Sequence, residues 1–68
     1  MTAAEYEPIL LSAARECWRA SKSYSEWMSS HPKAWGHQSP HFGEWDEARA
    51  YLGQMALWYG KACEEEER

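Results

Sequence analysis

The chain has 68 residues, 44% of them hydrophobic, which leaves room for a single domain near the lower size limit of independent folding. Its formal net charge is −4, and most of the acidic side chains lie in residues 35–68, which argues against binding to duplex nucleic acid. No apolar run approaches the ~18 residues of a membrane span, which argues against a membrane protein.

The hydrophobic residues are mostly aromatic. Five tryptophans, four tyrosines and one phenylalanine accompany few branched aliphatic residues, and valine is absent. Strands draw on β-branched residues, whereas Ala, Glu, Leu, Met, Arg and Lys favour helices. The composition therefore predicts an all-α fold.

The N-terminus lacks the basic and apolar regions of a signal peptide. We therefore expect a cytoplasmic protein, in which Cys17 and Cys63 are reduced thiols.

The first predicted helix covers about residues 8–30. Upstream of it, Thr2 and Glu5 have the spacing of a capping box, but Pro8 lies too deep for a helix that begins there. We expect a short separate first turn and a kink at Pro8, and Pro32 ends the helix shortly before it. Apolar residues recur every three or four positions along this segment, which predicts one buried stripe: Ile9, Ala13, Cys17, Ala20, Tyr24, Trp27 and His31.

Residues 31–42 form the predicted connector of an antiparallel helical hairpin. Its prolines and glycines lie where one helix must end and the next must begin, and the prolines stiffen the turn. Large aromatic side chains are expected to cap the end of the hairpin core, namely Trp35, Phe42 and Trp45.

The second predicted helix covers about residues 43–65. Its first residue is expected near Gly43, or alternatively at Ser39, where Ser39 would be the N-cap ahead of Pro40. The acidic run Glu64–Glu67 meets the negative end of the helix dipole, so we expect a frayed tail. Its predicted stripe is Trp45, Ala48, Leu52, Met55, Ala56, Tyr59, Ala62 and Cys63.

Both predicted helices carry apolar residues away from these stripes, and a two-helix hairpin has only one seam in which to bury them. Exposed aromatic patches beside arginine are typical of protein interfaces. We expect a homodimer that completes the core, an unidentified protein partner, or both. The candidate protein-binding residues form one group on each helix: Leu11, Arg15, Trp18 and Arg19, and Tyr51, Leu57 and Trp58.

The sequence contains no pattern typical of a catalytic site. No serine lies in a strained turn, no glycine-rich phosphate loop is present, and the cysteines lie far along the helices from the histidines. We expect no enzyme activity and no cofactor. Among the potential zinc ligands only His37 and His41 have a ligand-like spacing, so a zinc module completed by a second chain is an alternative function.

In size, acidity and aromatic content the chain resembles small phage-encoded inhibitors of host proteins, such as anti-CRISPR and anti-quorum-sensing proteins. That resemblance implies a non-enzymatic helical protein, often dimeric, in the cytoplasm of a host cell, and it assigns no site residue. The sequence predicts a protein-binding inhibitor or adaptor. A purely structural homodimer subunit is the first alternative, and the zinc module is the second.

Overall fold

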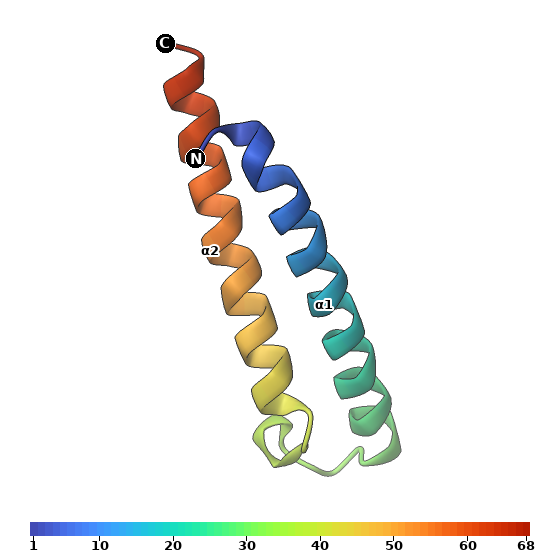
Figure 1. Cartoon of the computed structure of the whole chain (residues 1–68). Coiled ribbons are helices and arrows are strands. Elements are labelled where there is room, and N and C mark those ends of the chain that lie inside the picture. Colours follow the sequence, from blue (N-terminus) through green and yellow to red (C-terminus); the bar gives the residue numbers. More distant parts are fainter.

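Two long helices form an antiparallel hairpin in the computed structural model, which describes residues 1–68 (Figure 1). Helix α1 covers Ala3–Ser30, a 3-10 turn η1 covers Gly36–Gln38, and helix α2 covers Phe42–Glu66. The molecule measures 51 × 16 × 13 Å. The predicted all-α hairpin is confirmed.

The first helix starts five residues earlier than predicted. Thr2 is its N-cap, and the Thr2 hydroxyl accepts a hydrogen bond of 3.3 Å from the backbone N–H of Glu5. The helix continues without interruption through Pro8, so the prediction of a separate first turn is wrong. Because Pro8 lies only six residues into the helix, its missing N–H removes a single hydrogen bond near the end, where the Thr2 cap holds the first turn.

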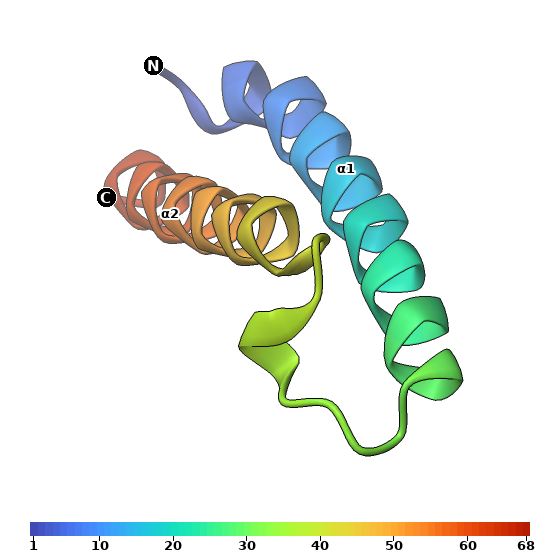
Figure 2. The ribbon, with the colours of Figure 1, turned by 90° about the horizontal axis from the view of Figure 1, so that it is seen from below.

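The second helix begins at Phe42, one residue from the Gly43 alternative. Ser39 is not its N-cap but closes the turn ahead of it. The buried Ser39 hydroxyl accepts from the backbone N–H of His41 at 3.1 Å, and the Ser39 carbonyl accepts from that of Phe42 at 3.1 Å. This turn directs the chain back along α1, as Figure 2 shows from below.

Small side chains form the seam between the helices. Only five of the 68 residues are buried, and no large side chain is fully buried. The larger residues of both predicted stripes are half-buried, with the exception of His31. His31 and Ala56 are exposed, so the prediction that they belong to the buried stripes is wrong. The hairpin by itself therefore encloses very little apolar volume. Its buried residues are Ala3, Ala13, Ala20, Ser39 and Ala62.

The open end of the hairpin is joined by the acidic tail. The backbone N–H of Ala3 donates to Glu66 Oε1 at 2.8 Å, which links the first residue of α1 to the last residue of α2. A carboxylate at a helix N-terminus accepts from an unpaired amide and also complements the helix dipole. The tail thus has a structural contact that its charge pattern alone does not indicate.

Candidate protein-interaction surfaces

An aromatic cluster fills the closed end of the hairpin. Tyr24 of α1 stacks on Trp45 of α2, with ring centroids 4.8 Å apart and planes inclined by 7°. Phe42 lies against both rings, at centroid distances of 6.2 Å from Tyr24 and 5.8 Å from Trp45. Trp35, in contrast, is 71% exposed, so its predicted place in this cap is wrong. Tyr24 takes its place as the third ring of the cluster. The sequence indicates this only through the position of Tyr24 on the buried stripe of α1.

The three histidines of the connector lie in different surroundings. His31 stacks on Trp27 at 4.0 Å, and its Nδ1 lies 2.9 Å from the Trp27 carbonyl oxygen. His41 lines the same shallow cavity as His31, whereas the ring of His37 lies beside Trp35 at 6.4 Å. No group of three or more His, Cys, Asp or Glu side chains is arranged to hold a metal ion. The zinc alternative built on His37 and His41 stays a prediction that requires ligands from a second chain.

Both cysteines are free thiols in half-buried positions on the two helices. Cys63 neighbours the hydroxyl of Tyr59, which also donates to Glu7 Oε1 at 3.4 Å. The hydrogen bond to Cys63 and its electrostatic effect, followed by the charge of Glu7, raise the pKa of Tyr59 above its ordinary value of 10.0. These side chains form a polar contact between the helices, and they have none of the geometry of a nucleophile beside a base.

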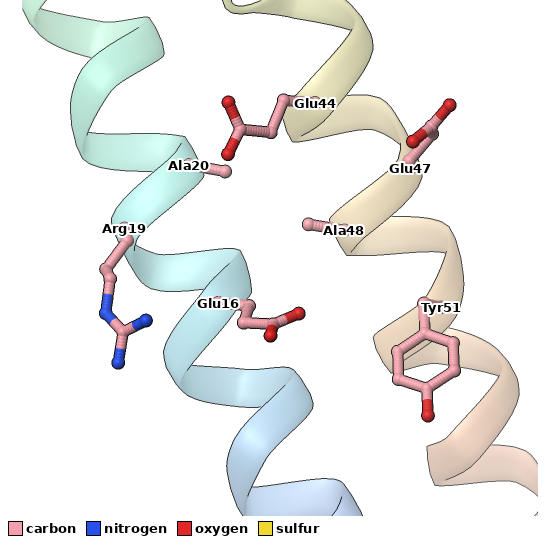
Figure 3. A pocket seen from close by; sticks show the side chains of 7 residues that line it. All are labelled: Glu16, Arg19, Ala20, Glu44, Glu47, Ala48 and Tyr51. Carbon is pink, nitrogen blue, oxygen red and sulfur yellow. The ribbon is translucent and has the colours of Figure 1, made fainter.

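A groove runs along one face of the hairpin between α1 and α2. Figure 3 shows Glu16 of α1 and Glu44 of α2 extending into the space between the helices, with Ala20 and Ala48 at heights between them. This part of the groove has a volume of about 450 Å³, and Arg19, Glu47 and Tyr51 complete its lining.

The groove continues toward the open end of the hairpin. A second cavity of about 460 Å³ shares Glu16 and Tyr51 with the first and adds Ile9 of α1. Trp58, two turns beyond Tyr51 on the same side of α2, lines a third cavity of about 220 Å³. Tyr51 and Trp58 are 48% and 49% exposed. We call this side of the molecule the groove face. Its residues are Arg19, Tyr51 and Trp58 and the carboxylates Glu16, Glu44 and Glu47.

The structure regroups the predicted binding residues. Arg19 lines the same cavity as Tyr51, from the opposite helix, and it is turned by ~100° from Trp18, the preceding residue of α1. Leu57, for the same reason, is turned away from Trp58 and from the groove, and it is exposed. The predicted group on α2 is therefore divided between two sides of that helix.

The outer side of α1 carries the remaining candidates. Leu11, Arg15 and Trp18 are exposed there, and Trp18 is 64% exposed. The ammonium group of Lys22 lies 5.4 Å from the centre of the Trp18 ring, a cation–π contact. The four-residue spacing of Trp18 and Lys22 on one helix could have predicted this pair from the sequence.

The groove carboxylates are lining residues that the predicted binding groups do not include. Those groups contain none of Glu16, Glu44 and Glu47. The available signal was the spacing of Glu44, Glu47 and Tyr51, three and four residues apart, which places all of them on one side of α2.

No protein-family model, no curated protein and no solved structure matches the chain. Neither helix has a stretch that is long and apolar enough to cross a membrane. A functional assignment therefore depends on the chemistry of the surfaces described above.

Proposed function

We propose that this chain is a protein-binding module that acts as an inhibitor or adaptor, and that it binds its partner on the groove face. The observation that carries the proposal is the grouping of Arg19, Tyr51 and Trp58 on one side of the hairpin, with both aromatic side chains about half exposed. Tyrosine, tryptophan and arginine dominate binding energy at protein interfaces.

The shape and charge of the groove favour a protein segment as the ligand. The groove is long and shallow, whereas small-molecule sites enclose most of their ligand. Three carboxylates line it beside a single arginine, so a basic segment with an apolar side chain for Tyr51 matches its charge and chemistry. The inhibitory role and a phage origin rest on the resemblance in size, acidity and aromatic content.

Partner capture from the native cell, followed by affinity measurement, tests the proposal. We expect Tyr51→Ala to weaken binding of the captured partner by roughly 30-fold or more, the loss typical of a central interface aromatic. Glu47→Gln should mainly reduce the association rate and the salt dependence, because rim charges act on encounter.

Trp18→Ala is the matched control, since it removes an exposed aromatic residue from the outer side of α1. Weakening by Trp18→Ala with no effect of Tyr51→Ala would move the binding site to that side. If both variants bind the partner as the wild type does, the proposal is wrong. If no partner is captured, a structural homodimer subunit becomes the better interpretation.

A further inference from the structure

The side of the hairpin opposite the groove carries no charge along its central part. On α1, the residues just past the seam on this side are Leu10, Ala14 and Cys17. On α2, the side turned away from Tyr51 and Trp58 carries small residues between Arg49 and Glu64. We call this side the uncharged face, and we define it as Leu10, Ala14, Cys17, Gly53, Ala56 and Gly60.

The two halves of the uncharged face lie at the same level of the hairpin. Ala3 contacts Glu66 at the open end, and Tyr24 stacks on Trp45 near the closed end. This antiparallel register places residues 10–17 beside residues 53–60. The face is therefore continuous across both helices, and the exposed Leu57 and Trp18 lie at its two edges.

The accessible surface of the chain is larger than that of an average folded monomer of this mass. It amounts to 5193 Å², whereas folded monomeric proteins of 7.9 kDa expose about 4,400 Å². The excess of roughly 800 Å² equals the area that each partner buries in a standard protein interface. The excess arises from the elongated 51 × 16 × 13 Å shape of the hairpin, which leaves an area of this size available to one further partner.

Gly53 and Gly60 have no role within the single chain. Both lie inside α2, neither has a positive φ, and a Cβ atom at either position would meet nothing within 4 Å. Glycine disfavours helix, so two unneeded glycines on one side of α2 are costly in isolation. Glycine also permits the close approach of another backbone, which a partner on this face would use.

We propose that a second copy of this chain packs on the uncharged face and forms a two-fold symmetric four-helix assembly. A two-fold interface places the same patch on both sides, so an uncharged patch complements itself. Two groove faces would instead bring Glu16, Glu44 and Glu47 of both copies together, which like charges oppose. The assembly leaves both groove faces outward, and it does not depend on the proposed function.

Substitution of one glycine distinguishes an effect on the dimer interface from an effect on the fold of the single chain. Gly53→Glu adds a charge to the uncharged face, and the open space around this position lets the single hairpin accept the side chain. Gln54→Glu is the matched control, because it adds the same charge one residue along, turned by ~100° on the same helix. Gly60→Glu repeats the test two turns away.

Sedimentation and thermal melting over a range of protein concentrations give the readout. We expect a mass of twice 7.9 kDa for the wild type and for Gln54→Glu, with a melting temperature that rises with concentration. Gly53→Glu and Gly60→Glu should sediment as helical monomers whose melting temperature is independent of concentration. A monomeric wild type at all concentrations overturns the proposal. A dimer that persists in both glycine variants also overturns it. Dissociation of the dimer by Tyr51→Ala, a substitution on the groove face, overturns it as well.

Discussion

Tyr24 and Trp45 stack face to face across the closed end of the hairpin, with ring centroids 4.8 Å apart. This pair joins the two helices next to the connector, in a molecule whose other interhelical contacts involve mostly small or half-buried side chains. The hydroxyl of Tyr24 also lies where a side chain at Gly36 would be, so the close approach of Tyr24 to η1 favours glycine at this position.

Removal of the Tyr24 ring is expected to destabilise the hairpin. Tyr24→Ala should lower the free energy of unfolding by about 2–3 kcal/mol, because it removes the stacking and the half-buried aromatic surface. Tyr24→Phe is the control that keeps the ring and should stay close to the wild type. Urea unfolding monitored by circular dichroism measures both. A Tyr24→Ala variant as stable as Tyr24→Phe would show that the stacked pair contributes nothing.

Gly36→Ala is expected to destabilise the protein through a steric overlap with the Tyr24 hydroxyl. The new Cβ would collide with this oxygen, and Tyr24 cannot move away without losing its stacking on Trp45. We expect a loss of about 1–3 kcal/mol in the free energy of unfolding. In a Tyr24→Phe background the Cβ meets only the ring carbon at an ordinary 3.5 Å, and the loss should disappear. A double-mutant cycle in which the two effects simply add would contradict this contact.

The hydrogen bond between Ala3 and Glu66 is expected to stabilise the open end. Glu66→Ala should lower the free energy of unfolding by about 1 kcal/mol, because it leaves a first-turn amide without its carboxylate acceptor. Glu64→Ala, also in the acidic tail, is the control and should change little. Hydrogen exchange should show faster exchange of the Ala3 amide in Glu66→Ala alone. Equal protection in both variants would exclude the contact.

Ionisation of Tyr59 is expected to destabilise the hairpin at high pH. Cys63, and then Glu7, raise the pKa of Tyr59 in the folded state, so folding favours the protonated phenol. The stabilisation is complete below pH 10 and is lost as the pH rises through the raised folded-state pKa. Ultraviolet titration of the wild type against Tyr59→Phe isolates this group among the tyrosines. Cys63→Ala should move its pKa back toward 10.0, and an unchanged pKa would disprove the assignment.

Zinc is expected to have no effect on stability. No group of three or more potential ligands is formed within the chain, so neither added zinc nor a chelator should shift the melting temperature. His37→Ala is the check on the alternative in which two chains share an ion. A melting temperature that rises with zinc in the wild type and not in His37→Ala would support that zinc module.

The sequence by itself determined the two helices and the sides on which their buried residues lie. The seam alanines Ala13 and Ala20 are in phase with Tyr24, and helical periodicity is a local property that needs no knowledge of the partner helix. The exposure of Leu11, Trp18, Tyr51 and Trp58 follows from the same periodicity, because one seam cannot cover them.

The tertiary structure alone decided which of these residues lie together. The register and rotation of the two helices place Arg19 with Tyr51, bring Glu66 to Ala3 and turn Trp35 outward. They also create the groove face and the uncharged face, each of which is built from both helices. Contacts between distant segments depend on how the helices pack, and a pattern within one segment contains no information about that relation.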